Sequence, residues 1–528
     1  MEIQIFGGIN EIGGNKIFIN ASKKHFLFDY GLSFNDRNEF FADFLNPRRF
    51  NGIIDYLYLK LIPSINQIYR NDLIKPYKDI LKQKPYNITE TDENIVDAFF
   101  LTHPHMDHYK FIGFLKQDTP IYMTWVSKAI LEFIAETSID PDLNEILKFH
   151  EQFKMVKKKT KPKNAKKYGY KRATKRDYSE EETKRSIKLL GKEKPIIFKG
   201  EQGDIEIEHY TVDHSIAGAC AYIVKYDGQS IVYTGDFRYH GLHPEWIDNF
   251  VENAKKSNPI AIITEGTRIP SIEKYNFKEY HGGEESEDDV KIRSRDMIRS
   301  HPGLILVNFP MRNLDRVLMY YKLAKKYDRI FAIDPKIYRM IDNFKDCLGD
   351  RPESDVELFL QDYPLPENDD EHIAIYLRRK GWGRFERRDY RGFEQKIFKN
   401  KEYITFKEIQ KEPERYMLYL NFYMLGELID INPDPNTTIY INSITDPFNE
   451  EMEIQERKLD SWLEHFGILK TETIHSSGHM CTDHLRETLD KINADNIIPI
   501  HTDHPETFEH LGLSGDIIIP ELKKKYNF

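Results

Sequence analysis

The stretch "THPHMDH" (102–108) places three histidines and one aspartate within six residues, directly after the apolar run "AFFL". Imidazole and carboxylate groups are ordinary ligands of a borderline-soft divalent ion such as zinc. His103 and His105 are two residues apart, so they project in the same direction from an extended strand end. Asp107 and His108 follow where we expect the chain to turn into a helix. This spacing predicts two half-sites, His103 with His105 for one ion and Asp107 with His108 for a second.

Three further candidate ligands each follow a predicted strand. His214 stands in "TVDHS", Asp236 in "VYTGDF" and His501 in "IPIHTDH". A lone histidine is more often a packed structural residue than a ligand, and His240 and His504 show that histidine is not rare in this chain. Strand ends gather along one edge of a sheet, however, where loops carry functional side chains. The shared position of the three candidates favours a metal site, in which the Asp236 carboxylate could bridge two ions.

The elements that must position these residues begin as a run of strands. The segments 2–8 and 16–31, rich in Ile and Phe and punctuated by turn residues, predict strands, and 94–102 predicts a buried strand that leads into the histidine cluster. The segment 121–137 predicts a short strand and an amphipathic helix. Four strand-like stretches follow between 194 and 266, and the pair Asp227-Gly228 among them predicts a hairpin turn.

Beyond Arg268 the pattern changes to alternating strands and helices. The segment 303–334 predicts strand, helix and strand, which is typical of a parallel sheet. The segments 471–480 and 496–504 predict strands that end in histidines, and 51–62 predicts a helix that stops at Pro63. Strands that first meander and then alternate with helices predict an α/β sandwich.

Length and composition set broad limits on the chain. At 528 residues, two or more domains are expected. No uncharged apolar run approaches the roughly 20 residues that cross a bilayer. The N-terminal residues lack the pattern of a secretory signal, and three scattered cysteines make no disulfide framework. We therefore expect a cytoplasmic protein without membrane partners.

The net charge of -10 conceals a strongly basic segment. Residues 154–194 hold 17 Lys/Arg and 5 Asp/Glu, which leaves the rest of the chain near -22. A basic segment on an acidic body is a frequent footprint of nucleic-acid contact, and Tyr168 and Tyr170 within it could stack on bases. A solvated insertion is the alternative interpretation.

Taken together, the motifs resemble a known family. Asp29 in "FLFDYG", "THPHMDH", "VDHS" and "TGDF" resemble, in this order, four motifs of the metallo-β-lactamase fold. Glu265 in "ITEGTR", His479 in "HSSGHM" and His501 in "IPIHTDH" resemble motifs A, B and C of the β-CASP nuclease branch. With the glycine-rich start "FGGINEIGGN", the set is most similar to ribonuclease J and its archaeal relatives.

The resemblance implies a fold and its domains. It implies an α/β metallo-β-lactamase αββα sandwich built from residues 1–268 and 467–528, with a basic insertion at about 150–195. A β-CASP domain of parallel-sheet type would be inserted as residues 269–466.

The resemblance also implies a role for each motif residue. The implied ligands of one Zn²⁺ are His103, His105 and His214. The implied ligands of the other are Asp107, His108 and His501, with Asp236 bridging. Asp29 would orient the ligand loops, and Glu265 would hold a motif histidine in one tautomer. The residues implied to meet the scissile phosphate are Ser477, Gly478 and His479. Asp107, His479 and Glu265 would be the catalytic residues.

The implied activity is a zinc-dependent ribonuclease with two ions per chain, for which Mn²⁺ is a substitute. A bridging hydroxide, its proton accepted or oriented by Asp107, would attack an RNA phosphodiester. Resemblance to ribonuclease J favours a 5′→3′ exoribonuclease of RNA processing or decay that takes single-stranded, 5′-monophosphorylated RNA, and a homodimer is one assembly it allows. The histidine at motif C, His501, is typical of RNA-acting members. Arg312 or Arg316 could face RNA, although Arg316 could equally form a salt bridge within its helix.

Three alternatives stay open at this point. The chain could be a β-CASP endoribonuclease, a metallo-β-lactamase-fold hydrolase of a small substrate, or a catalytically silent RNA-binding protein.

Overall fold

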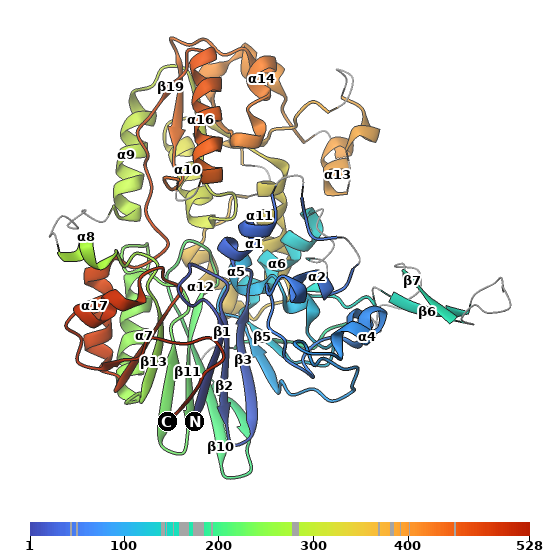
Figure 1. Cartoon of the computed structure of the whole chain (residues 1–528). Helices are drawn as coiled ribbons and strands as arrows, with labels where there is room; N and C mark the ends of the chain where they lie inside the picture. Colours follow the sequence, from blue (N-terminus) through green and yellow to red (C-terminus); the bar gives the residue numbers. More distant parts are fainter. Residues whose placement is uncertain are drawn as a thin grey trace.

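The computed structural model contains three principal sheets and a separate hairpin. It describes the chain except for residues 43–44, 49–50, 139–142, 144, 152, 158–167, 173–183, 192–193, 277–284, 368–369, 381–384, 391, 401 and 448–449. In Figure 1, the sheet built from strands of residues 304–470 lies with its helices above the other two sheets. We call these two parts the upper lobe and the lower lobe.

The first sheet of the lower lobe has seven strands in the order β22-β1-β2-β3-β4-β5-β8. Their bounds are β22 (Lys525–Asn527), β1 (Glu2–Gly7), β2 (Lys16–Ala21), β3 (Lys24–Tyr30), β4 (Ala98–Phe100), β5 (Ile121–Met123) and β8 (Ile187–Leu189). The strands pair antiparallel from β22 to β3 and parallel from β3 onward. Because β22 pairs with β1, the two ends of the chain lie side by side (Figure 1).

The second sheet also has seven strands, in the order β21-β20-β13-β12-β11-β10-β9. Their bounds are β21 (Asp516–Ile517), β20 (Asn496–Ile500), β13 (Ala261–Glu265), β12 (Gln229–Tyr233), β11 (Cys220–Tyr226), β10 (Asp204–Thr211) and β9 (Ile196–Lys199). Tyr226 pairs with Gln229 across Asp227 and Gly228, both of which have positive φ, as a two-residue primed turn requires. The predicted hairpin is confirmed.

The two sheets of the lower lobe pack face to face. Ile5, Phe28 and Phe100 of the first sheet share a buried core with Tyr222 and Ile263 of the second. The helix α6 (Trp125–Thr137) covers the outer face of the first sheet, and the helices α7 (Pro244–Lys256) and α17 (Thr482–Ile492) cover that of the second. The lower lobe is therefore layered as helices, sheet, sheet and helices, because each sheet buries an apolar face on both sides.

The upper lobe is built on an all-parallel sheet of six strands, in the order β16-β15-β17-β14-β18-β19. Their bounds are β16 (Ile373–Ile375), β15 (Ile330–Ile333), β17 (Tyr416–Tyr419), β14 (Leu304–Asn308), β18 (Thr438–Asn442) and β19 (Leu469–Lys470). The main helices are α9 (Glu287–Ser300), α10 (Leu314–Lys326), α11 (Pro335–Leu348), α12 (Glu353–Asp362) and α16 (Glu450–His465). The prediction of a mixed α/β chain with a parallel sheet is confirmed.

The lobes are joined by a continuous apolar core. Trp125 of α6 packs against Phe359 of α12 with ring centroids 4.8 Å apart, and Asn343 of α11 donates from Nδ2 to the carbonyl of Ala129 at 2.8 Å. Apolar residues of α6 and of the parallel sheet belong to the same buried cluster.

Two sequence-based predictions of local structure are wrong. No strand forms over 471–480, where one was predicted, and β19 ends just before it at Lys470. Beyond it the chain crosses to the lower lobe as a loop, since the carbonyls of Ser477 and Gly478 accept hydrogen bonds from lower-lobe side chains. The helix predicted over 51–62 is a single turn, α2 (Ile54–Tyr58), because the chain reverses at Lys60 with φ of 61°.

Most of the basic segment lies outside the described residues, and so does the predicted stacking of the Tyr168 and Tyr170 side chains. Its described backbone includes a hairpin of β6 (Phe153–Lys157) and β7 (Tyr168–Arg172), which projects from the lower lobe in Figure 1. Arg185, near the end of the segment, is buried and donates to the carbonyls of Gly113 at 2.9 Å and Glu145 at 2.8 Å. It is a structural residue.

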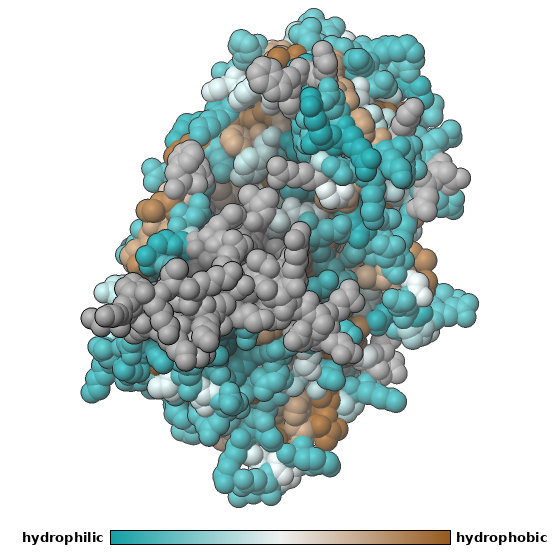
Figure 2. All heavy atoms as spheres, turned by 90° about the vertical axis from the view of Figure 1, so that its right-hand side faces the viewer, coloured by the Kyte–Doolittle hydropathy of each residue, from teal (hydrophilic) through white to brown (hydrophobic). Residues whose placement is uncertain are grey.

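Among the described residues, no helix combines the length and the apolar character that a bilayer crossing requires. Among the coloured residues of the face shown in Figure 2, hydrophilic side chains dominate and apolar ones form small, separate patches.

Candidate metal centre

The metal-capable residues predicted from the sequence meet at one edge of the lower lobe, which we call the metal edge. His103 follows β4, and His105 is the N-cap of the short helix α5 (Met106–Tyr109), which carries Asp107 and His108. His214 follows β10, Asp236 follows β12 and His501 follows β20. Four strand ends from two sheets thus bring the candidates together.

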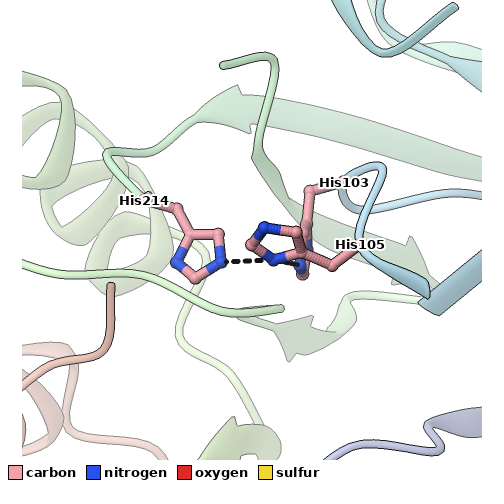
Figure 3. A group of neighbouring side chains, drawn as sticks. All are labelled: His103, His105 and His214. Atoms are coloured by element: carbon pink, nitrogen blue, oxygen red, sulfur yellow. Dashed lines mark hydrogen bonds between the residues drawn. The ribbon is translucent and has the colours of Figure 1, made fainter. Parts of the chain in front are cut away.

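The first group consists of His103, His105 and His214, whose ring nitrogens converge (Figure 3). The Nδ1 atom of His105 lies 3.1 Å from Nε2 of His103 and 3.0 Å from Nε2 of His214. A tetrahedral ion with bonds of about 2.0–2.1 Å holds its nitrogen ligands about 3.3 Å apart. The three rings are therefore arranged as one face of a metal site.

The second group consists of Asp107, His108, Asp236 and His501, all of them buried. The Nε2 atom of His501 is 3.2 Å from Oδ2 of Asp107, and the Nε2 atom of His108 is 3.7 Å from the same oxygen. This group offers two imidazoles and two carboxylates.

Asp236 lies between the two groups. Its Oδ2 atom is 3.2 Å from Nε2 of His108 and 3.5 Å from that of His501, and it is 3.6 Å from His103 and 3.9 Å from His214. One carboxylate oxygen thus faces ligand atoms of both groups, which is the position of a bridging ligand.

Two buried polar atoms of this set of donors indicate that it fits a divalent cation. Oδ1 of Asp236 is buried and has no hydrogen-bond partner among the described residues, and Nε2 of His108, 3.2 Å from Oδ2 of Asp236, makes no hydrogen bond of good geometry there. Buried polar atoms without partners are costly, so they are rare in native structures. Cations held between the two groups would satisfy both atoms.

The electrostatics of the second group favour the same conclusion. Burial alone would lower the pKa of His501, but the Asp236 and Asp107 carboxylates outweigh it and raise this pKa to about 9. Burial tends to raise the pKa of Asp107, yet His108 and His501 lower it to about 2. The pocket therefore stabilises positive charge, which a metal ion would supply in place of imidazolium protons.

Asp29 supports the second group through a hydrogen bond to His108. It is fully buried at an irregularity of the β2–β3 pairing, with φ of 53°. Its carboxylate accepts hydrogen bonds from the Thr102 amide at 2.9 Å, the Thr102 hydroxyl at 2.8 Å, the Tyr233 hydroxyl at 2.7 Å and His108 Nδ1 at 2.8 Å. Because Nδ1 of His108 is engaged, Nε2 is the nitrogen presented to the metal edge.

Close backbone approach explains Gly13 of the glycine-rich start and Gly31, which follows β3. A Cβ on Gly31 would lie 1.5 Å from the Asp107 carbonyl oxygen, and one on Gly13 would lie 2.7 Å from Oδ2 of Asp107. The two glycines therefore let α5 sit against the first sheet with Asp107 at the metal edge.

His479 reaches the metal edge from the loop before α17. Its Nδ1 atom lies 2.8 Å from Oε2 of Glu265, at the end of β13, and the other Glu265 oxygen accepts from the Phe237 amide at 3.1 Å. Glu265 thus orients the ring, and Nε2 is the nitrogen left to face a ligand. His479 is partly exposed, with 21% of its side chain accessible.

The same loop is tied directly to a metal-capable histidine. The Gly478 carbonyl lies 2.6 Å from Nδ1 of His214, and a Cβ on Gly478 would lie 2.6 Å from Oγ of Ser215. Glycine is therefore required for Ser477 and His479 to approach the first group so closely.

Several residues of the site were not predicted from the sequence. Thr102, Tyr233 and Thr267 support the ligands, since Oγ1 of Thr267 lies 2.8 Å from Nδ1 of His501. All three stand within three residues of a motif residue, which was the available signal. Arg316 does not face a ligand, because it is buried and pairs with Glu287 of α9 at 2.7 Å rather than within its own helix. Arg312 is only half-buried. Burial lowers the pKa of His105 to about 4, and the charges of His108 and, least of all, Arg312 contribute in the same direction.

No protein-family model matches the sequence, and no curated protein matches it significantly. Among solved structures, the chain is similar to the crystal structure of a protein of unknown function from Enterococcus faecalis V583, with a TM-score of 0.65 and 19% identity over 99% of both chains. The metallo-beta-lactamase fold protein YhfI from Bacillus subtilis is also matched, with a TM-score of 0.25 and 15% identity over 50% of this chain and 70% of that chain. The first likeness is one of fold and extends over both lobes.

Proposed function

We propose that this protein is a metal-dependent ribonuclease that hydrolyses RNA phosphodiester bonds. The observation that carries the proposal is the pair of ligand groups that share Asp236 beside the oriented imidazole of His479. A phosphodiester needs charge neutralisation at both the attacking and the leaving oxygen, which two adjacent cations provide.

Zinc is the proposed cofactor, two ions per chain, because histidine and carboxylate ligands suit it, and Mn²⁺ is a substitute. When bound, such ions supply a water nucleophile at neutral pH and neutralise charge on the phosphate. The residues to hold one ion are His103, His105 and His214. Those to hold the other are Asp107, His108 and His501, with Asp236 shared.

The side chains at and around the ligands would handle the proton and stabilise the negative charge of the reaction. The Asp107 carboxylate, buried beside His501, orients or accepts the proton of the attacking water. His479 is held by Glu265, so its Nε2 atom is available to stabilise charge on a phosphoryl oxygen or the leaving oxygen. The loop Ser477–Gly478 would bring backbone groups against the same phosphate.

Polymeric RNA is the proposed substrate, rather than a small molecule, because of what surrounds the metal edge. The upper lobe brings the half-buried Arg312 within electrostatic reach of His105. The lower lobe carries the basic segment, and phosphate contacts supply most sequence-independent affinity for nucleic acids. The motifs that resemble ribonuclease J make a 5′→3′ exonuclease on 5′-monophosphorylated RNA the specific proposal. The upper lobe would then be a β-CASP domain inserted into a metallo-β-lactamase fold.

The test is to incubate the purified protein, with zinc or manganese, with 5′-monophosphorylated, 5′-triphosphorylated and circular RNA of one sequence. The proposal predicts degradation of the first and much slower loss of the second. Cleavage of the circle would instead indicate an endonuclease. If no RNA is degraded while a lactam or thioester is hydrolysed, the small-substrate alternative replaces the proposal. Binding of RNA without any turnover would favour the silent RNA-binding alternative.

A further inference from the structure

A cluster of buried charged side chains joins the lobes directly behind the metal edge. Its members come from both lobes and are all buried. They are Asp213, Arg238, Glu287, Asp315 and Arg316. We call them the interlobe ion cluster.

Arg238 is the centre of the cluster and is fully buried. Its Nε atom donates to Oδ1 of Asp213 at 2.6 Å, and its Nη1 atom donates to Oε1 of Glu287 at 2.7 Å. Arg238 is two residues from Asp236, and Asp213 directly precedes His214. The guanidinium therefore connects two metal-ligand loops to the first turn of α9.

Glu287 extends this network of ion pairs into the upper lobe. Its carboxylate accepts from Nε of Arg316 at 2.7 Å and from Nη2 at 3.1 Å, while its amide donates to the carbonyl of His240 at 3.1 Å. Arg316 lies in the first turn of α10, directly after the loop that carries Arg312. One carboxylate thus holds the starts of α9 and α10 against the lower lobe.

The cluster also hydrogen-bonds to the backbone of the loop that carries His479. The Ser477 carbonyl accepts from Nη1 of Arg238 at 3.1 Å and from Nε2 of His240 at 2.9 Å. The next carbonyl, that of Gly478, is held by His214. The loop makes no strand pairing over these residues, so side-chain donors determine where its carbonyls lie.

Burial of ion pairs is weak evidence for a stabilising role. Desolvation of the charges can exceed their attraction, so apolar residues of similar volume often serve stability equally well. What a guanidinium offers here is geometry, since its fixed fork reaches two carboxylates and a carbonyl at once. An ammonium group keeps the charge but lacks the fork.

We propose that Arg238 is a positioning residue, which with Glu287 fixes the Ser477–His479 loop against the metal edge and makes the placement of His479 depend on the docking of the upper lobe. Its effect on turnover rests on the proposed function. Its effect on the loop does not.

The first experiment measures hydrogen exchange of the amides in 475–481, in the metal-free protein and in the zinc-loaded protein. Arg238→Lys is expected to raise exchange in this loop about 10-fold in both forms of the protein. The matched control is Arg70→Lys, because Arg70 is an equally buried arginine that pairs with Asp72 and Glu145 on another part of the lower lobe. Unchanged protection of 475–481 in Arg238→Lys would refute the positioning role.

Glu287→Gln provides a second variant if Arg238→Lys does not fold. It keeps the size and some hydrogen bonds of Glu287 but removes the charge between the two arginines. We expect the same increase of exchange in 475–481, and native-like protection there would count against the proposal.

The second experiment is a double-mutant cycle on turnover. Arg238→Lys should lower kcat about 10²-fold with KM nearly unchanged, because the reacting group is misplaced while substrate contacts remain. If Arg238 acts through His479, the same substitution in a His479→Ala background should have almost no further effect. Additive losses would show that Arg238 acts by another route. If no phosphodiester is hydrolysed by the wild-type protein, the proposed function fails, and the exchange experiment still decides the positioning role.

Discussion

The Nε2 atom of His501 lies 3.2 Å from Oδ2 of Asp107, although 394 residues separate them in the chain. The contact completes a ligand group that α5 alone supplies only in part. It also brings the end of β20, in the second sheet, against a helix that packs on the first sheet. The metal edge is therefore formed only when both sheets of the lower lobe are in place.

Removal of the shared carboxylate should affect both ions. Wild-type protein is expected to hold two zinc ions per chain, and Asp236→Ala to hold fewer than one, because Oδ2 of Asp236 faces ligand atoms of both groups. Elemental analysis after dialysis measures this directly. His214→Ala, which alters only the first group, should retain close to one ion. Equal losses in the two variants would contradict a shared ligand.

Asp29→Asn should weaken one ion selectively. An amide cannot accept all the hydrogen bonds that the Asp29 carboxylate accepts from Thr102, Tyr233 and His108. The His108 ring would lose its orientation, and affinity for one of the two ions should fall about 10–100-fold. Zinc titration with a chromophoric chelator gives both constants. Two unchanged constants would show that Asp29 does not orient a ligand.

His479→Ala should separate binding of metal from turnover. The ring contacts Glu265 and belongs to neither the first nor the second group, so zinc content should stay at the wild-type value. Turnover of RNA should fall about 10²–10³-fold, the usual loss when one donor to a developing negative charge is removed. Retained turnover would remove His479 from the mechanism. Glu265→Gln should give a smaller loss, because the ring remains but its tautomer is no longer held.

Excision of the basic segment should change the salt dependence of RNA binding. Lys148 and Lys184 pair as an isolated antiparallel bridge, so a short glycine-serine turn can replace residues 152–182 and leave the buried Arg185 in place. The slope of log affinity against log salt should become flatter, because fewer phosphate contacts are made. A control that keeps the segment but changes its lysines to glutamine should give the same flattening. An unchanged slope would show that the segment does not grip RNA.

Within the interlobe ion cluster, Glu287 should contribute an acid-sensitive part of the stability. Asp315 contributes with the opposite sign, because burial and the neighbouring Asp213 carboxylate raise its pKa to about 7. Burial tends to raise the pKa of Glu287, but Arg238 and Arg316 lower it to about 2. A carboxyl group whose pKa is lowered by folding contributes stability above its ordinary pKa of about 4.5, and this contribution is lost as pH falls toward 2. About 3 kcal/mol depends on this ionisation. Urea unfolding in EDTA should show a steeper loss between pH 6 and pH 3 for wild type than for Glu287→Gln, and equal slopes would contradict the assignment.

Local sequence determined the parts of this protein that depend on neighbouring residues. The division of "THPHMDH" into His103/His105 and Asp107/His108 follows from a strand end that turns into a helix, and α5 indeed begins at Met106. The parallel sheet was likewise predictable, since alternating strand and helix patterns leave few other folds. The loop at 471–480 was not predictable, because its carbonyls bond to side chains distant in sequence rather than to a neighbouring strand.

Only the tertiary structure decided how the half-sites are joined. The position of Asp236 between both groups, the contact of Glu265 with His479 and the burial of Arg316 against Glu287 are all contacts between distant segments. The strand-end pattern only allowed the first, and only the resemblance implied the second. Spacing along the chain reports which side chains can face the same way over a few residues. It carries no information about which strand ends meet at an edge, because that depends on how two sheets and a second lobe bury their apolar faces together.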